Sequence, residues 1–488
     1  MAEKYVKSTH VSSEEENLLK LVDENEQNLI DLLKNLVSID SRSYSQDVFS
    51  DQAEIFAFIE KFMKNAGAEC EYYKCPHPNS NKGENGDWLN LVSYREGKEK
   101  GKFLQYCGHV DVVPFTEEKW DEGLHPLKPV VRDGRIYGRG AADMKGGIAA
   151  QMMAFKLLQD AGIPIKGKFQ LLLFPDEEIN GNYGAQFMAR EHKDVIDADG
   201  TIISESTAFP PITSPTIIVG EKGHLWLKIR VFGASGHGSM PKPKSNSINK
   251  ATRLISNWKK IPFPKINAPI SVITMIKSLL KRFSLKTILK FLFSSKDGED
   301  ADPYDEDGTG IGNFFKTTIS FTKIKAGTKT NVIPDVCDLE VDIRLLPGIK
   351  KQSIMDSLTR YCTKLGYRVQ LPENYKNIQK SNKKIQKRQI DVAIKEISAT
   401  PGTFVDPNNP FSKLIGEAFE NVYNRSIIYF FAPGATDAVH LREKGIRDVV
   451  VFGPTGGFAH DSNEYIEVEH LLKTCKVFLL LAYRMLCN

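Results

Sequence analysis

The chain has 488 residues, of which 65 are basic and 61 acidic, and a formal net charge of +4. This length exceeds what one ordinary hydrophobic core supports, so two domains are expected. The balanced charge gives no broad positive field that would attract phosphate backbones, and we therefore expect no nucleic-acid partner.

The N-terminal part predicts an amphipathic helix followed by α/β architecture. Ser13 and Glu16 have the spacing of a capping box, and apolar residues recur at helical spacing as far as Leu36. Beyond this helix, apolar runs predict strands that alternate with helical segments such as residues 147–160. These runs are residues 103–106, 169–174, 201–203 and, before a final helix over about 468–485, residues 448–452.

Between residues 218 and 400 the pattern changes to alternating strands, at 224–231 and 338–344, joined by long polar connections. This change predicts an inserted second domain. The expected division is a discontinuous domain of residues 1–217 and 401–488, and an insert of residues 218–400 with an extended insertion near 268–315.

Charge is unevenly distributed within the insert. Residues 266–295 hold no acid and carry five basic residues. This pattern indicates either an amphipathic helix pair that contacts a membrane surface or a partner or, more favoured, a packed lid helix with a solvated basic face. Residues 297–307 are densely acidic but lack the spacing of a calcium loop. Together with residues 376–388, they predict solvated surface segments.

The compartment follows from cysteine usage and from the ends of the chain. Seven scattered cysteines without a CxxC pair predict reduced thiols. Residues 1–16 lack the apolar stretch of a secretory signal, and the apolar run at 477–482 is far shorter than a bilayer span of about 20 residues. A cytoplasmic location without a membrane partner is the expectation.

Two histidines far apart in the chain are candidate metal ligands. His109 and Asp111 are two residues apart, so on an extended segment both point to one side, and the carboxylate can fix the metal-binding tautomer of the imidazole. A structural His-x-Asp pair explains this motif equally well. Near the other end, His460 lies in a glycine-rich approach to the final helix.

Several carboxylates follow predicted strands or turns. Asp143 lies in a glycine-rich turn before a helix, where it either caps the helix or bridges two cations. That turn matches neither GxGxxG nor GxxxxGK[ST]. Glu177 and Glu178 would repel each other in a half-buried site unless cations or protons intervene. Glu205 follows another strand, and because sites in open α/β sheets lie beyond the carboxyl ends of strands, a shared pocket is expected.

Together, these segments resemble the M20 metallopeptidases and amidohydrolases, in the family's order and over nearly the whole chain. The segments that carry the resemblance are residues 108–114, 138–147, 176–178, 204–206, 236–238, 331–334, 342–348 and 459–461. The resemblance implies a mixed-sheet α/β catalytic domain with two metals, interrupted by a smaller α+β, ferredoxin-like lid domain.

The resemblance also implies a divided ligand set. One metal would be held by His109, Asp143 and Glu205, and the other by Asp143, Glu178 and His460. Asp143 would thus bridge two divalent ions. The mixture of imidazole and carboxylate favours zinc, with cobalt or manganese as alternatives.

The remaining implied roles concern catalysis and substrate. Asp111 would orient His109, and Glu177 would act as general base toward the water that bridges the metals. His237 would stabilise the oxyanion. Asn331 and Arg344 would hold a substrate carboxylate, to which the planar guanidinium is suited.

The implied activity is hydrolysis of an amide bond in an N-acyl amino acid or short peptide that bears a free carboxylate. The sequence Ala142-Asp143-Met144-Lys145 is closer to the deacylase and desuccinylase branch than to the dipeptidase branch. A dipeptidase or carboxypeptidase, and a non-catalytic metal-binding or scaffold protein with the same fold, are the alternatives. The resemblance also implies a homodimer through the lid. Ala435 stands where many relatives have a second glycine.

Overall fold

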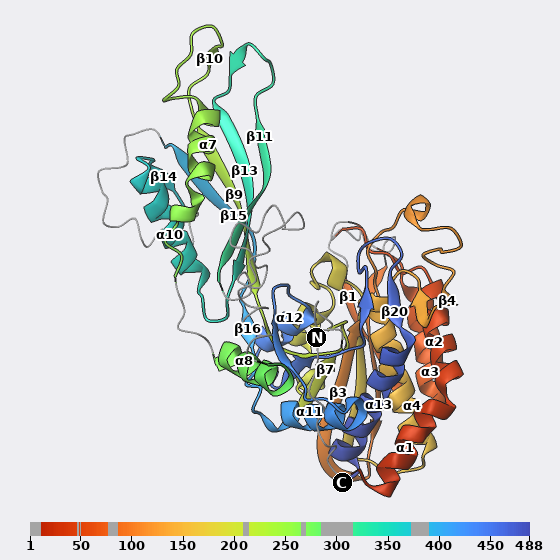
Figure 1. Cartoon of the computed structure of the whole chain (residues 1–488). Coiled ribbons are helices and arrows are strands. Elements are labelled where there is room, and N and C mark those ends of the chain that lie inside the picture. The colour runs from red at the N-terminus through yellow and green to blue at the C-terminus, as the bar shows by residue number, and fades with distance from the viewer. Residues whose placement is uncertain are drawn as a thin grey trace.

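The computed structural model describes residues 11–45, 48, 50–76, 86–207, 214–264, 270–284, 316–371 and 390–488. They form two units, one built around a nine-stranded sheet and the other around a five-stranded sheet (Figure 1). The acidic segment 297–307, the charged segment 376–388 and most of the predicted insertion near 268–315 lie outside the described residues.

The nine-stranded sheet is mixed. Its order is β1-β2-β6-β3-β7-β18-β8-β16, and β17 also pairs with β8. The strands β6, β3, β7 and β18 run parallel, and β1 and β2 are antiparallel to their neighbours. The strand β8 is antiparallel to β18 and β16 and parallel to β17. The bounds are β1 (Glu69–Pro76), β2 (Asp87–Glu96), β3 (Glu99–His109), β6 (Lys166–Phe174), β7 (Gly200–Ile203), β8 (Ile217–Glu221), β16 (Thr403–Phe404), β17 (Tyr429–Ala432) and β18 (Val449–Val451).

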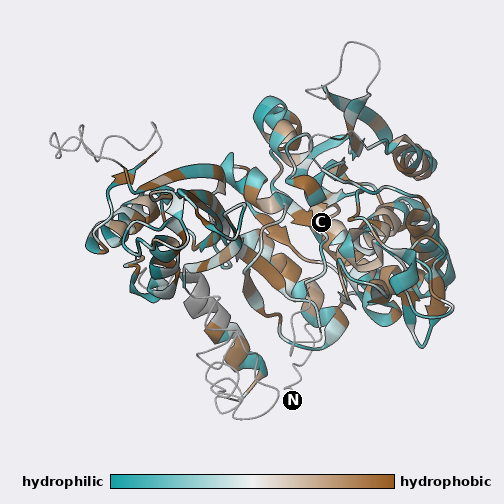
Figure 2. Ribbon diagram, turned by 90° about the horizontal axis from the view of Figure 1, so that it is seen from above, coloured by the Kyte–Doolittle hydropathy of each residue, from teal (hydrophilic) through white to brown (hydrophobic). Residues whose placement is uncertain are grey.

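These strands confirm the α/β class, and every strand expected in this part of the chain is present. Helices cover the sheet, and apolar and polar residues alternate along them (Figure 2). The helices of this unit are α1 (Ser13–Glu24), α2 (Glu26–Ser38), α3 (Ala53–Asn65), α4 (Gly146–Asp160), α5 (Ala185–Glu191), α6 (Lys193–Ile196), α11 (Pro410–Tyr423), α12 (Asp437–Glu443) and α13 (Val468–Leu486).

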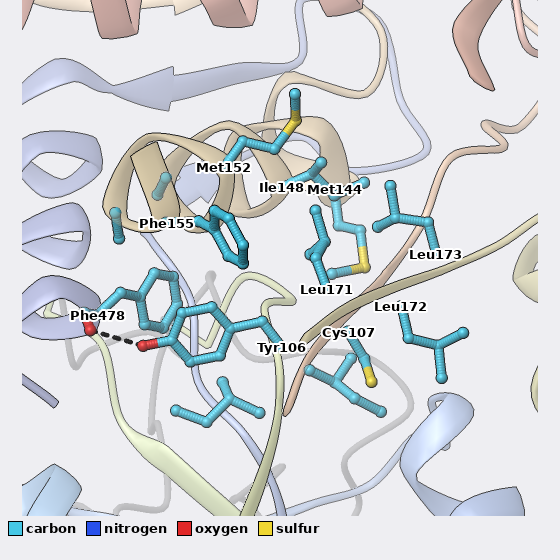
Figure 3. Packing of buried hydrophobic residues seen from close by; sticks show 14 of the residues in the cluster. Tyr106, Cys107, Met144, Ile148, Met152, Phe155, Leu171, Leu172, Leu173 and Phe478 are labelled. Atoms are coloured by element: carbon cyan, nitrogen blue, oxygen red, sulfur yellow. Dashed lines mark hydrogen bonds between the residues drawn. The ribbon is translucent and has the colours of Figure 1, made fainter. Parts of the chain in front are cut away.

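The core joins the two ends of the chain. Tyr106 of β3 is fully buried, and its hydroxyl donates a hydrogen bond of 2.6 Å to the carbonyl of Phe478 in α13 (Figure 3). Phe155 of α4 and Phe169 of β6 stack beside it with ring centroids 4.7 Å apart. Because buried aromatic side chains each remove a large apolar area from water, this cluster fixes α4 and α13 on the sheet.

The opening helix differs from its prediction in two respects. The capping box is formed by Ser12 and Glu15, one residue earlier than expected, with Glu15 N–H donating to Ser12 Oγ at 3.2 Å. The Ser12 pair has the same spacing as the Ser13 pair, so spacing alone does not separate them. The helix is also interrupted at Asn25, which caps α1 and precedes α2.

The five-stranded sheet has the order β11-β13-β9-β15-β14. Its apolar face is covered by two helices, α7 (Ser247–Ser256) and α10 (Lys351–Lys364), and its other face carries half-buried and exposed polar residues. The strands are β9 (Gly223–Phe232), β11 (Thr318–Ala326), β13 (Val336–Leu345), β14 (Val369–Gln370) and β15 (Val392–Thr400). The alternation expected at 224–231 and 338–344 corresponds to β9 and β13.

The chain crosses between the sheets at Lys222 and again at Pro401-Gly402. Both crossings are tight, since a Cβ atom at Gly223 would lie 2.1 Å from the carbonyl oxygen of Thr400. Beside them, the buried Glu221 carboxylate accepts a hydrogen bond from Arg442 Nη1 at 2.8 Å and one from the Thr436 hydroxyl at 2.8 Å. The junction is therefore fixed by backbone contact and by a buried ion pair.

The basic segment contributes α8 (Ile270–Arg282), which packs against β17 of the nine-stranded sheet. Ser278 Oγ accepts a hydrogen bond from the backbone N–H of Tyr429, and Arg282 donates to Ser214 Oγ at 2.6 Å. Lys277 and Lys281 are exposed. α8 is thus a packed helix with two exposed lysines, but it packs against the nine-stranded sheet instead of the lid, and Arg282 is fully buried.

No helix within the described ranges has both the length and the apolar character that a bilayer crossing requires.

Candidate metal centre

The predicted ligands lie on loops at one edge of the nine-stranded sheet. His109 ends β3, Glu178 follows β6 and Glu205 follows β7, and these three strands are parallel neighbours. Asp143 precedes α4, and His460 lies between β19 (Gly456–Gly457) and β20 (Tyr465–Glu467). The small sheet β19-β20-β5-β4, which includes β4 (Val130–Arg132) and β5 (Arg135–Tyr137), holds these last two segments together.

Asp143 lies between the two histidines. His109 Nε2 is 3.1 Å from Asp143 Oδ1 and 3.0 Å from Glu205 Oε1. His460 Nε2 is 3.1 Å from Asp143 Oδ2 and 3.1 Å from Glu178 Oε2. The five side chains are therefore divided into two sets that share one carboxylate. Asp143 is not the helix cap, since α4 begins three residues later.

Two groups of side chains have potential ligand atoms within 4.8 Å of one another, namely His109 with Asp143 and Glu178, and His109 with Glu177 and Glu205. Glu178 Oε1 is buried and has no hydrogen-bond partner among the described residues. Imidazole and carboxylate donors, together with an orphaned buried oxygen, fit divalent cations such as zinc.

The pKa shifts within the cluster also favour bound cations. Burial raises the pKa of Glu177 and Glu178, and burial together with the charge of Asp143 raises the pKa of Glu205 to about 8. Burial opposes protonation of His109, but Glu205, Asp111 and Asp143 outweigh it and hold the pKa of His109 well above its usual value. The site thus concentrates negative charge that bound cations would neutralise.

Asp111 contacts His109 as predicted, but its backbone carbonyl lies closer to the imidazole than its carboxylate does. His109 Nδ1 lies 3.0 Å from the backbone carbonyl oxygen of Asp111 and 3.3 Å from its carboxylate. The carboxylate oxygens accept the backbone N–H groups of Glu177 and Glu178, at 3.1 and 3.2 Å. Asp111 therefore connects the imidazole to the short 3₁₀ turn (Glu177–Ile179) that carries both glutamates.

Glu464 is a site residue that the sequence reasoning missed. Its Oε1 accepts the backbone N–H groups of Ala142 and Asp143, at 2.9 and 3.1 Å, and its Oε2 accepts a hydrogen bond of 2.5 Å from Arg139. Its carboxylate is fully buried. Glu464 thus fixes the backbone that presents the shared carboxylate, but no motif pairs it with a segment more than three hundred residues earlier.

A cavity of about 810 Å³ lies between the two units and is lined by Glu177 and Glu178. The five-stranded sheet contributes Arg344 to the lining of the same cavity. Arg344 donates to Asp342 Oδ2 from Nε and Nη2, at 3.2 and 2.9 Å. Sequence reasoning missed the other residues that the five-stranded sheet contributes to the lining, which are His224, Trp226, Ile397, Ser398, Ala399 and Thr400.

His237 and Asn331 are not brought to this cavity. They belong to the distal tip (residues 236–240 and 331–333), where β10 (Gly236–His237) pairs with β12 (Val332–Ile333). Both side chains are exposed, and Gly238 N–H donates to the Asn331 carbonyl at 2.8 Å. Figure 1 shows the distal tip at the end of the five-stranded unit that is remote from the nine-stranded sheet.

Comparison with known proteins adds three findings. The sequence model of peptidase family M20/M25/M40 matches residues 106–484. A succinyl-diaminopimelate desuccinylase of Sulfurovum sp. is 26% identical over 453 residues, 92% of this chain and 97% of that protein. The human N-fatty-acyl-amino acid synthase/hydrolase PM20D1 is 32% identical over 261 residues, 51% of this chain and 50% of that protein.

Among solved structures, human carnosine dipeptidase 1 is similar, with a TM-score of 0.68 and 16% sequence identity. The match covers 97% of this chain and 99% of the dipeptidase. At this level of identity the similarity shows the fold alone.

Proposed function

The chain belongs to peptidase family M20/M25/M40, whose members are metal-dependent hydrolases, and we propose that it cleaves the amide bond of an N-acyl amino acid with a free carboxylate. The observation that carries this proposal is the position of Asp143, whose two oxygens each face a different imidazole, His109 and His460. A carboxylate in that position suits a bridge between two cations.

His109, Asp143 and Glu205 would hold one cation, and Asp143, Glu178 and His460 the other. Zinc is the proposed metal, because imidazole and carboxylate ligands suit it, and cobalt or manganese are the alternatives. Bound cations would lower the pKa of a coordinated water and polarise the scissile carbonyl.

The protein groups perform the proton transfers. Glu177 lies beside the ligand cluster and lines the cavity, so its carboxylate is placed to take a proton from the attacking water and to return it to the departing amine. The Asp111 carboxylate holds Glu177 through its backbone N–H. Arg344 would pair with the substrate carboxylate at the opposite wall.

Two observations from sequence similarity favour an N-acyl amino acid over a dipeptide. The Asp143-Met144-Lys145 sequence is closer to the deacylase branch, and both relatives named above act on acylated substrates according to their names. Cleavage of a dipeptide or of a peptide carboxyl terminus is the competing activity.

We further propose that the distal tip acts in the site of a second copy. His237 is exposed and remote from the cavity of its own chain, so a homodimer through the five-stranded unit would supply the imidazole that stabilises the oxyanion, and Asn331 with it. This unit would then serve both as lid and as dimerisation domain, although residues 218–221 of the predicted insert, 218–400, belong to β8 of the nine-stranded sheet.

The test combines metal content with turnover. Metal-free protein would be reconstituted with zinc, cobalt or manganese and assayed on N-acyl amino acids and dipeptides, and two metals per chain with chelator-sensitive hydrolysis are expected. Glu177→Gln would lower kcat by about 10²–10⁴-fold while the metal content stays unchanged. Glu443→Gln, at another acid of the same cavity, is the control.

Unchanged hydrolysis after chelation or in Glu177→Gln would refute the proposal. Two bound metals without turnover on any amide would instead favour the non-catalytic scaffold.

A further inference from the structure

The part of the cavity formed by the five-stranded sheet is an ordered set of cross-strand neighbours. In the register of the sheet, Arg344 of β13 lies opposite His224 of β9, and Thr400 of β15 lies opposite His224 on the other side. Two residues along β9, Trp226 lies opposite Ser398. Since alternate residues of a strand share one face, His224 and Trp226 point to the same side as Arg344, into the cavity that all three line.

A β-bulge adds an apolar side chain to this face. Glu396 pairs with Leu227 and Ser398 with Trp226, so Ile397 is an extra residue without a partner on β9. Bulges re-aim side chains and are frequent beside active sites. Ile397 is 50% exposed and lines the cavity.

The wall is held in place by its neighbours. The His224 ring lies 4.6 Å from the Trp226 ring, and His224 is hydrogen-bonded to Thr400 Oγ1 at 2.7 Å and to Ser398 Oγ at 3.0 Å. Burial and the charge of Arg344 lower the pKa of His224 to about 4, so this ring is neutral at physiological pH. On the β9 and β15 side of Arg344 this surface is therefore uncharged and partly aromatic, whereas on β13 the Asp342 carboxylate lies opposite Trp226 and pairs with Arg344 at 2.9 Å.

We propose that Trp226 and Ile397 form a specificity wall that accepts an apolar side chain on the same residue whose carboxylate binds Arg344. The inference rests on the proposed function, because that function places the carboxylate at Arg344. The wall and Arg344 lie on one face of the same sheet, whereas the metal ligands and Glu177 belong to the other unit, so the apolar group sits on the amino-acid side of the scissile amide. The preferred substrates are then N-acyl derivatives of leucine-like or phenylalanine-like amino acids.

An ordinary surface isoleucine is the competing explanation for Ile397, and the chain offers a matched control. Ile324 of β11 lies in the same sheet, is 59% exposed and does not line the cavity. Its replacement by serine removes the same apolar group from the same sheet without touching the proposed wall.

The experiment compares kcat/KM for substrates that share one N-acyl group and differ only in the amino acid. Wild-type protein is expected to prefer N-acyl-leucine and N-acyl-phenylalanine over N-acyl-alanine by at least about 10-fold, as apolar pockets discriminate by roughly 10–200-fold per methylene. Ile397→Ser should reduce this preference about 10-fold while turnover of the alanine substrate changes little. Trp226→Ala should act in the same direction, Trp226→Phe should restore most of the preference, and Ile324→Ser should leave it unchanged.

Two results would refute the proposal of a specificity wall. One is an equal loss for all substrates in Ile397→Ser, and the other is a change in preference for the acyl chain instead of the amino acid. If no amide is hydrolysed, the proposed function fails, and the wall is then tested by calorimetric binding of N-acyl-leucine and N-acyl-alanine. Equal affinities for these two ligands would refute it without reference to turnover.

Discussion

The candidate metal centre and the distal tip both contain histidines that the sequence marks as candidate site residues, but the two regions are built in different ways. The cluster draws His109, Asp143 and His460 from distant segments; backbone contacts hold His109 and Asp143, and the exposed His460 ring contacts the Asp143 carboxylate. The distal tip presents His237 on a two-residue strand, exposed and far from the cavity. One region is thus assembled within a single chain, whereas the other would require movement or a second copy to reach a cavity like that of its own chain.

Asp143→Ala is expected to have the largest effect on metal content and on hydrolysis. Both proposed cations lose a shared ligand, so bound metal should fall from about two per chain to one or none, and hydrolysis should fall by more than the 10²–10⁴-fold expected for Glu177→Gln. Elemental analysis of the purified variant and a turnover assay check this. Full metal occupancy in Asp143→Ala would show that this carboxylate is not a bridge.

His237→Ala tests the other region. Loss of one oxyanion donor should lower kcat by about 10²–10³-fold and leave metal content unchanged, because the side chain is remote from the ligands. Mixing this variant with Glu177→Gln should restore part of the activity if the tip acts in the partner's site, since a mixed dimer contains one intact combination. No recovery in a demonstrated mixed dimer would place His237 in the site of its own chain.

Glu464→Gln tests how the candidate metal ligands are held in position. The amide keeps the shape but weakens the interactions with Arg139 and with the N–H groups of Ala142 and Asp143. Metal affinity should fall by about 10–100-fold, as for other groups that orient a metal ligand. Competition titration with a chelating dye measures this, and an unchanged affinity would limit Glu464 to a structural role.

The free energy of unfolding of the two units should also change with pH in opposite directions, and this is the smallest of the predicted effects. Burial favours the neutral acid at Asp391, but Arg368 and Lys250 outweigh it and lower the pKa of Asp391 to about 2. Its contribution is therefore present above the unfolded value of 3.8 and is lost as pH falls toward 2. Asp391→Asn should cost roughly 1 kcal/mol at neutral pH and almost nothing near pH 2.

In metal-free protein, by contrast, Glu205 has a raised pKa of about 8, so the nine-stranded unit should lose stability as pH rises from 4.5 toward 8. Denaturant unfolding of the metal-free wild type and of Asp391→Asn between about pH 2 and pH 8 checks both signs. A variant equally unstable at pH 2 and pH 7 would contradict the expected linkage.

Local patterns were sufficient to predict most of the fold. Apolar runs gave β3, β6, β7 and β18, and period-two alternation gave β9 and β13, because both signals arise from burial of one or two strand faces. The register of the capping box was missed because the neighbouring serines Ser12 and Ser13 offer equivalent caps. The break at Asn25 was also missed. The docking of α8 on β17 depends on tertiary contacts that periodicity does not contain.

For the site, the ordered motifs indicated which residue types gather beyond the strand ends, and five ligand candidates do converge in the structure. Arg344 also reaches the cavity. Glu464, Trp226 and Ile397 were not found, because a buried carboxylate that caps backbone N–H groups and a bulge that re-aims a side chain have no fixed spacing. The separation of His237 from the ligands is a property of quaternary or domain arrangement, on which local sequence gives no information.

The two crossings between the sheets have a consequence for synthesis. The chain leaves the nine-stranded sheet after Glu221, and β18 and α13 are translated only after the whole insert. Translation adds about 5–20 residues per second, so β18, the neighbour of β7 in the sheet, is synthesised on the order of tens of seconds after β7. During that interval the nascent core exposes an unpaired strand edge, so the five-stranded unit has time to fold first, and the nine-stranded unit is the one expected to depend on chaperones.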